Sequence, residues 1–291
     1  MKISVVINSR DEGHWLRDTV ENLADTLPSD REILVVDDGS EDGSADFLRR
    51  NRKLARLIRN PSPLGMPVAR NRGARRSTGG VIVFSDAHMR YGRDWWRPLV
   101  DTLERPKVGA AASIVGATNN DAPPFGYGFT LPRPDLAPAW IAKPKTNRML
   151  PSLFLPGCCL GMKREVFEAT GGYDEGFRTR GSVDAELGIR FWLLGYENWM
   201  APASQVWHHF RVNAPYPVPH TDAIHNRLRT ALVHFSYWRV TQVVQALSAD
   251  DCVGPALLEV VKGEVAARRS ELFAKRIRDD DWLFQKFGID W

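Results

Sequence analysis

Short apolar runs alternate with segments of helical periodicity along the first 115 residues. Residues 14–27, 68–76 and 95–103, and a short stretch around 47–48, carry apolar side chains at helical spacing. Runs typical of buried strands lie at residues 3–7, 32–36, 56–58, 81–84 and 108–115. Strands that alternate with helices predict an α/β fold, with a mostly parallel sheet, right-handed crossovers and helices on both faces.

The pattern changes after residue 116. Residues 117–156 are rich in Asn, Pro, Gly and aromatic side chains, which is typical of a functional loop. Helices at 164–169 and 184–194 follow, then a strand that ends at 206–207, and finally two helices at 222–247 and 255–277. The sequence therefore predicts a main domain over residues 1–221 and a C-terminal helical extension, residues 222–291, packed on it.

Composition and charge narrow the choice of protein class. A chain of 291 residues with 43% hydrophobic side chains can bury a full core, and a net charge of +4 favours anionic ligands such as nucleotides, nucleic acid or phosphorylated carriers. Cys158 and Cys159 are adjacent and Cys252 is alone, so the spaced framework of secreted disulfide proteins is missing. The apolar run at 3–7 is too short for a signal sequence or a membrane span. We expect a soluble, cytoplasmic protein without membrane insertion.

Polar clusters follow three of the predicted strands, at residues 8–12, 37–38 and 86–88. In a doubly wound sheet, ligands bind at the carboxyl ends of the strands, so these clusters are expected to meet at one site. Asp38 could accept hydrogen bonds from a base or a ribose. Alternatively, residues 37–40 are a turn in which Asp caps the next helix.

Asp86 and His88 stand one residue apart just after a buried strand. A carboxylate and an imidazole at this edge can hold a divalent metal, although a surface turn with an incidental His has the same spacing. His208, after another predicted strand, offers a further imidazole from a distant segment. Carboxylate and imidazole ligands with open positions suit Mn²⁺, or a similar divalent ion, bridging a diphosphate.

Several motifs resemble those of glycosyltransferases with the GT-A fold. Residues 5–7, 35–40, 65 and 69–73 resemble family 2 enzymes. Residues 85–88, 171–176, 190–192 and 206–211 are similar to the catalytic domain of polypeptide N-acetylgalactosaminyltransferases. The similarity covers about residues 3–235. It implies a catalytic domain over residues 1–221. The irregular stretch at 117–156 is where we expect contacts to the acceptor.

The resemblance also assigns roles to individual residues. It implies that Asp86, His88 and His208 ligate the metal, and that His209 is a neighbour and not a ligand. Arg211 and Tyr216 match a loop that closes over the diphosphate. The residues expected to bind the donor are Asn8 and Asp38 at the uridine, Arg10, Arg70, Asp86, Gly157 in the sugar pocket, Arg211 and Tyr216.

The chain departs from that family at two positions. Val183 replaces a Glu that contacts the sugar, so the identity of the donor sugar does not carry over, and Ala214 replaces a His of the closing loop. Asp184 and Glu186 instead resemble the catalytic pair of family 2, whose Asp is a general base toward the acceptor hydroxyl. That role implies inversion at the anomeric carbon. If Asp184 is not the base, the alternative is transfer with retention at the anomeric carbon by a front-face mechanism, and Asp184 would only cap its helix.

Two basic clusters allow a different acceptor. Most of these side chains are expected to form a solvated face, but they could flank a site for a hydroxylated DNA base that Phe125, Tyr127 and Phe129 would stack against. The clusters are Arg70, Arg72, Arg75 and Arg76, and Arg49, Arg50, Arg52, Lys53, Arg56 and Arg59.

Together these observations predict a metal-dependent glycosyltransferase that moves a sugar from a UDP-sugar to a hydroxyl or thiol, first of all on a peptide or protein. The alternatives are a hydroxylated DNA base, a glycan or a small metabolite as acceptor. A non-catalytic nucleotide-sugar binding protein is a further alternative. A sugar-nucleotide pyrophosphorylase needs a Gly-rich phosphate loop after the first strand, and residues 8–12 lack those glycines.

Overall fold

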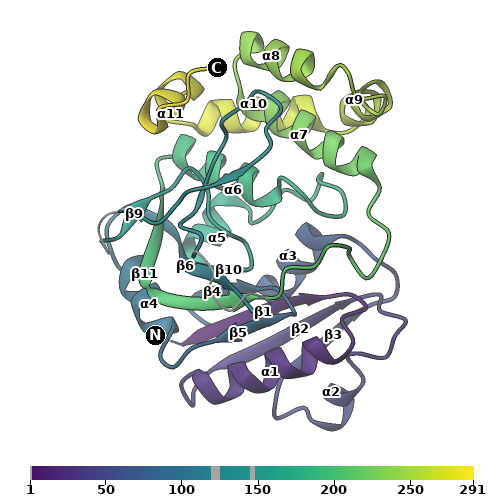
Figure 1. The fold of residues 1–291 in the computed structure, drawn as a ribbon, viewed down its shortest axis with the longest axis vertical. Coiled ribbons are helices and arrows are strands. Elements are labelled where there is room, and N and C mark those ends of the chain that lie inside the picture. The colour runs from purple at the N-terminus through teal and green to yellow at the C-terminus, as the bar shows by residue number, and fades with distance from the viewer. Residues whose placement is uncertain (1, 119–124, 145–147) are drawn as a thin grey trace.

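The computed structural model describes residues 2–118, 125–144 and 148–291 (Figure 1). Its strands are β1 (Ile3–Ser9), β2 (Glu32–Asp38), β3 (Arg56–Asn60), β4 (Val81–Ser85), β5 (Met89–Tyr91), β6 (Val108–Ala117), β7 (Phe129–Thr130), β8 (Ala139–Trp140), β9 (Leu150–Pro151), β10 (Cys159–Lys163) and β11 (Glu197–His208). Its helices are α1 (His14–Thr26), α2 (Phe47–Arg50), α3 (Met66–Arg76), α4 (Trp96–Leu103), α5 (Arg164–Thr170), α6 (Val183–Leu193), α7 (His220–His234), α8 (Tyr237–Leu247), α9 (Val253–Lys262), α10 (Val265–Lys275) and α11 (Asp280–Phe287).

The central sheet follows the order β3-β2-β1-β4-β10-β6-β11-β5, and β9 pairs with β11. Parallel pairing joins β3, β2, β1 and β4, and also β6 and β11. Because β10 is antiparallel to both β4 and β6, these two neighbours point the same way. The strands β3, β2, β1, β4, β6 and β11 therefore share one direction, which confirms a mostly parallel α/β sheet. The reversed strands β10 and β5 are short, and the sequence pattern did not predict them.

Helices cover both faces of the sheet, as predicted, because successive strand residues point to opposite sides. Val5 of β1 packs in a core cluster with Leu16 of α1. The next residue, Val6, packs in the cluster of the other face with Ala69 of α3. Helix α3 lies close to the sheet because Gly73 has no side chain, and a Cβ there would collide with Val6. This close approach brings the polar residues of α3 to the edge of the sheet.

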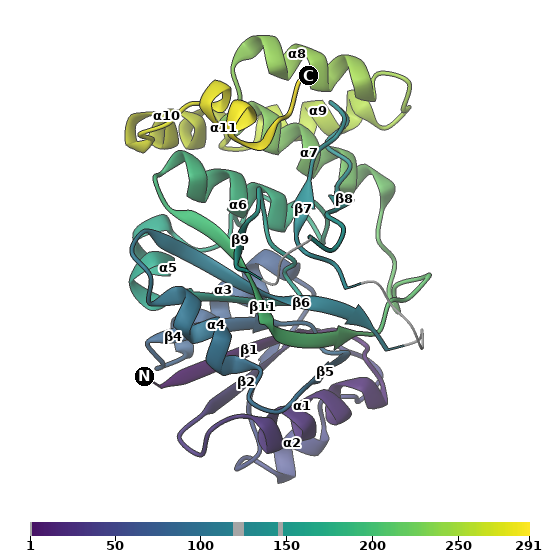
Figure 2. The same ribbon diagram turned by 60° about the vertical axis from the view of Figure 1, so that its left-hand side comes forward.

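The C-terminal region forms five helices where the sequence predicted two. The predicted helix at 222–247 is divided into α7 and α8, the helix at 255–277 is divided into α9 and α10, and α11 was not predicted. The first break lies at Ser236, whose backbone N–H and hydroxyl both donate to Asp280, and the second lies at Gly263. Figures 1 and 2 show these helices as a layer at one end of the molecule, with α6 between them and the sheet. Helix α7 starts two residues before the predicted domain boundary, which itself stays a prediction.

In the 117–156 region, β7 pairs antiparallel with β8, and β9 adds to the main sheet. None of the helices in the described ranges is both long and apolar enough to span a membrane.

Candidate active site

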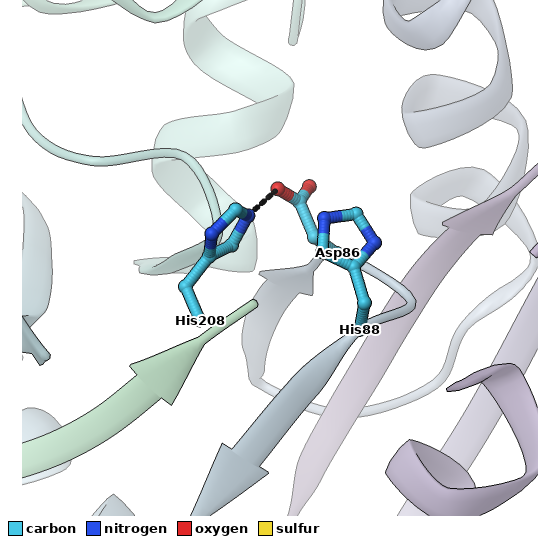
Figure 3. Close-up of side chains that lie close together, drawn as sticks. All are labelled: Asp86, His88 and His208. Atoms are coloured by element: carbon cyan, nitrogen blue, oxygen red, sulfur yellow. Dashed lines mark ion pairs between the residues drawn. The ribbon is translucent and has the colours of Figure 1, made fainter. Parts of the chain in front are cut away.

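Asp86, His88 and His208 lie together where β4 and β11 end (Figure 3). The backbone N–H of Asp86 donates to the carbonyl of Cys158 at 3.2 Å, just beyond β4. His208 is the last residue of β11 and pairs with Met89 of β5, next to His88. Each of the three residues has one candidate ligand atom, and these atoms lie within 4.8 Å of one another. The structure therefore brings the three predicted metal ligands together from distant segments.

The chemistry of this cluster fits a divalent cation. One carboxylate oxygen and two imidazole nitrogens form a mixed donor set that suits Mn²⁺. Nε2 of His208 lies 3.4 Å from Oδ2 of Asp86, and Nδ1 of His208 is buried without a hydrogen-bond partner among the described atoms. Burial favours a higher pKa for Asp86, but the hydrogen bond from His208 and the charge of Arg70 outweigh it and hold the pKa well below its usual range. The carboxylate is therefore ionised, as a metal ligand must be.

Arg70 joins this cluster to the other predicted site residues. The side chain is 1% exposed, so Arg70 is not one of the residues of its cluster that form a solvated face. Because every N–H of a buried guanidinium needs a partner, its contacts fix several acceptors around one cation. Arg70 donates to Oδ1 of Asp86 (3.0 Å), the carbonyl of Gly157 (2.9 Å), Oδ1 of Asp184 (3.1 Å), the hydroxyl of Tyr173 (3.1 Å) and Oδ1 of Asn8 (2.9 Å).

Asp184 stands in the first turn of α6, and its carboxylate faces Arg70. It also accepts a hydrogen bond from the backbone of Gly157, where a Cβ would collide with it. Burial raises the pKa of Asp184, and the nearby charge of Arg70 opposes this shift. A carboxylate with a raised pKa takes up a proton more readily, which is the property that a general base needs.

The structure does not bring Glu186 to this site. Its carboxylate is 1% exposed and accepts hydrogen bonds from Nε of Arg190 (2.8 Å) and Nε2 of His234 (2.9 Å). Burial alone favours a higher pKa for Glu186, but the charge of Arg190 outweighs it and holds the pKa well below its usual range. Residues two apart on a helix do not share a face, so Asp184 points to the site and Glu186 to the interior. The expected catalytic role of Glu186 is therefore wrong, because the residue forms a buried ion pair with Arg190.

A hollow of about 270 Å³ opens onto the metal-ligand cluster. Asn8, Arg211 and Tyr216 line it, all of them predicted to bind the donor. A smaller hollow beside it shares Asn8 and Tyr216 and adds Arg10 and Asp38. The guanidinium of Arg10 lies 4.5 Å from the centre of the Tyr216 ring. Six of the eight predicted donor residues thus line these two adjacent hollows, and Arg70 and Gly157 line neither of them.

Asp38 is largely engaged with the protein itself. Its Oδ1 accepts hydrogen bonds from the side chain of Asn60 (2.7 Å) and the N–H of Leu64 (2.9 Å), and its Oδ2 accepts from the N–H of Gly65 (2.9 Å). These bonds order the turn that leads into α3. Each carboxylate oxygen has two acceptor sites, so Oδ2 keeps room for one more donor. A contact between Asp38 and uridine stays a prediction.

Two residues of the site had no role in the sequence analysis. Glu12 accepts hydrogen bonds from His88 and Arg211, and its place in the polar run at 8–12 was a signal that it reaches this edge. The hydroxyl of Tyr173 accepts a hydrogen bond from Arg70, and only the place of Tyr173 in the motif at 171–176 pointed to the site. His209 lies outside the three-residue cluster, as expected.

The aromatic residues proposed to stack on a flipped base are engaged elsewhere. Tyr127 is 4% exposed, and the Phe129 ring stacks on Phe154 with centroids 5.1 Å apart. Phe125 packs edge-on against Trp207 at 6.1 Å. The expectation that these rings are free is therefore wrong, and an acceptor base on DNA loses its supporting observation. Residues 119–124 and 145–147, where acceptor contacts were also expected, lie outside the described residues.

The second basic cluster is the solvated face that its spacing predicts. All six of its members are exposed: Arg49, Arg50, Arg52, Lys53, Arg56 and Arg59.

Fold and site together define a protein of the GT-A glycosyltransferase class. The structure of GalNAc-T7 with UDP, GalNAc and Mn²⁺ superposes with a TM-score of 0.82 at 20% identity, over 99% of this chain and 57% of that one. The mannosyltransferase PcManGT from Pyrobaculum calidifontis, in complex with GDP-Man and Mn²⁺, gives a TM-score of 0.56 at 18% identity, over 94% of this chain and 85% of that one.

The chain belongs to glycosyl transferase family 2, whose sequence model matches residues 4–171. Polypeptide N-acetylgalactosaminyltransferase 11 of Xenopus tropicalis is 31% identical over 239 residues, which cover 74% of this chain and 39% of the relative. The probable N-acetylgalactosaminyltransferase 8 of Caenorhabditis elegans is 30% identical over 223 residues, which cover 69% of this chain and 53% of the relative. The resemblance seen in the motifs is thereby confirmed. The chain spans about two fifths to one half of the length of these relatives.

Proposed function

We propose that this protein is a metal-dependent glycosyltransferase that transfers a sugar from a UDP-sugar to a hydroxyl or thiol acceptor. The observation that carries the proposal is the position of Arg70, which holds Asp86 of the metal-ligand cluster and Asp184 on one buried guanidinium. Arg70 therefore holds two groups at a fixed spacing, as a transfer reaction requires. One is a metal site that can receive a diphosphate, and the other is the carboxylate of Asp184, which can receive a proton.

In this proposal Asp86, His88 and His208 hold Mn²⁺ or a similar divalent ion. The ion, when bound, neutralises the negative charge that grows on the departing diphosphate. Arg211 and Tyr216, which line the same hollow, bind the diphosphate from the other side. Support for UDP and Mn²⁺ comes from the GalNAc-T7 complex, which has the same fold and contains both.

Asp184 accepts the proton of the acceptor nucleophile as it attacks the anomeric carbon. Its raised pKa suits that role, and a positioned general base contributes about 100- to 10,000-fold in rate. Attack assisted by such a base inverts the anomeric centre. The relative from Xenopus tropicalis is named a polypeptide N-acetylgalactosaminyltransferase, which makes a peptide or protein hydroxyl the first acceptor to test.

The test begins with hydrolysis of UDP- and GDP-sugars, with Mn²⁺ or with a chelator. We expect slow hydrolysis of a UDP-sugar that the chelator abolishes. His88→Ala should lose the Mn²⁺-dependent part of UDP binding. His220→Ala, which changes an exposed His on α7, should not. Unchanged UDP affinity in the His88 variant would contradict the proposed metal site. Tight nucleotide binding without turnover of any UDP- or GDP-sugar would identify a non-catalytic binding protein.

The acceptor and the stereochemistry need a second experiment. Peptide arrays that contain Ser, Thr and Cys are incubated with the protein and the intact UDP-sugar that it hydrolyses fastest. The linkage in the product is determined by NMR. An inverted product supports Asp184 as the base. A retained product, or full transfer activity in Asp184→Asn, contradicts that role.

A further inference from the structure

Glu12, like Arg70, contacts the metal-ligand cluster from outside it. Its side chain is 7% exposed, in the segment between β1 and α1. One oxygen, Oε2, lies 3.0 Å from Nδ1 of His88 and 2.6 Å from Nη2 of Arg211. A single buried carboxylate oxygen thus joins a predicted metal ligand to an arginine of the segment after β11.

The hydrogen bond with Glu12 selects one tautomer of the His88 ring. An ionised carboxylate only accepts hydrogen bonds, so Nδ1 of His88 must carry the proton. Neutral imidazole then has its lone pair on Nε2. Figure 3 shows one ring nitrogen of His88 directed toward Asp86 and the other turned away from it. The nitrogen that Glu12 leaves free is therefore the one that faces the metal-ligand cluster.

Further contacts tie the same region to the segment after β11. The backbone N–H of His209 donates to the carbonyl of His88 at 3.0 Å. The ring of His209 stacks on Trp15 with centroids 4.1 Å apart. The backbone N–H of Trp15 donates to the backbone carbonyl of Glu12 at 3.2 Å. Residues 12–15 thus hold residues 209 and 211, and the side chain of Glu12 links that contact to His88.

We propose that Glu12 is a positioning residue that holds the His88 ring in the tautomer and orientation needed for metal binding, and that anchors the segment after β11 through Arg211. This inference rests on the metal site of the proposed function. Carboxylates that orient a metal-bound histidine commonly change metal affinity by about 10- to 100-fold when they are removed.

The experiment measures Mn²⁺ affinity by calorimetry in the full chain without nucleotide, so that no activity is needed. Glu12→Ala should weaken Mn²⁺ binding by about 10- to 100-fold. Glu12→Gln, whose amide oxygen can still accept from Nδ1, should weaken it less. Glu21→Gln on the exposed face of α1 removes the same charge and should change affinity by less than about twofold.

A second readout separates positioning from a general loss of structure. In ¹⁵N spectra of the metal-free protein, His88 should be protonated at Nδ1, and Glu12→Ala should shift the ring toward the Nε2–H form. An unshifted His88 signal, or an Mn²⁺ affinity within twofold of the unchanged protein, overturns the inference. If His88→Ala also leaves Mn²⁺ affinity unchanged, the metal site itself fails. If the Glu12 variants keep the Mn²⁺ affinity but His88→Ala loses it, the metal site is supported and the role of Glu12 is contradicted.

Discussion

Replacement of Arg70 by Met tests the central electrostatic claim about the site. Met keeps much of the apolar stem of Arg70 but removes the cation shared by Asp86 and Asp184. Both carboxylates are more than two thirds buried, so neither regains full contact with water. Removal of one partner of a buried ion pair costs about 3–5 kcal/mol, because the remaining charge stays desolvated.

The assay is thermal unfolding of the metal-free protein at pH 7. A loss of about 3–5 kcal/mol corresponds to a fall in Tm of roughly 6–20 °C in a chain of this size. Arg75→Met is the matched control on the same helix, because Arg75 is 57% exposed and forms a surface ion pair with Glu175. That variant should lose less than about 1 kcal/mol.

The pH dependence has a defined sign. In the unchanged protein the pKa of Asp86 is lowered, so its ion pair stabilises the fold fully above about pH 4 and less as the pH falls through the lowered value. The deficit of Arg70→Met should therefore be largest at pH 7 and shrink below about pH 4. Equal Tm values for the Arg70 and Arg75 variants at pH 7, or a deficit that grows in acid, would refute the reasoning.

Three further variants probe the neighbouring groups. Asp184→Asn should lower transfer by about 100- to 10,000-fold, yet leave Tm at pH 7 unchanged or higher, because the pKa of the buried carboxyl is raised and its ionised form costs stability above that pKa. Gly157→Ala should displace Asp184 and reduce transfer in a folded protein, whereas Gly254→Ala, with open space around it in α9, should be neutral or stabilising by up to about 1 kcal/mol. Glu186→Gln should cost about 3–5 kcal/mol by leaving Arg190 unpaired, with unchanged UDP affinity below its Tm.

Each of these variants has an outcome that contradicts its basis. A lower Tm for Asp184→Asn means that the carboxylate stabilises the fold at pH 7. Full transfer by Gly157→Ala means that Asp184 need not approach the backbone. Loss of UDP binding without loss of stability in Glu186→Gln would restore a direct role for that residue.

The parallel core of the fold and the metal-ligand cluster were predictable from the sequence for the same reason. Strands β1, β2, β4 and β6 each contain a buried apolar run, and the polar residues that follow such strands must meet at one edge because parallel strands end together. Asp86 and His88 follow from that rule, and His208 follows from the strand before it. The short reversed strand β10 was missed because its five residues, with Gly161 in the middle, lack a distinctive alternation.

The sequence was least informative where a side chain's role depends on distant packing. Arg70 lies in a cluster of arginines, and only the close packing of α3 against the sheet turns it inward while Arg75 stays exposed. Glu186 stands two residues from Asp184, but α6 directs it toward His234 on a helix that the sequence could not place. The break at Ser236 depends on Asp280, which is 44 residues further along the chain.

The reversal of β10 has a consequence for how this scaffold can diversify. Because β10 runs antiparallel to β6, it starts at the edge of the sheet where β6 ends. The chain therefore returns to the candidate site at that edge, and Gly157, which accepts from Arg70, lies just before β10. In the chain between these strands, Tyr127, Leu131, Leu136, Leu153, Phe154 and Leu155 are buried, so substitutions at exposed positions such as Arg133 and Lys143 disturb Gly157 and its bond to Arg70 least. Such exposed positions can therefore change while Asp86, Arg70 and Asp184 keep their spacing.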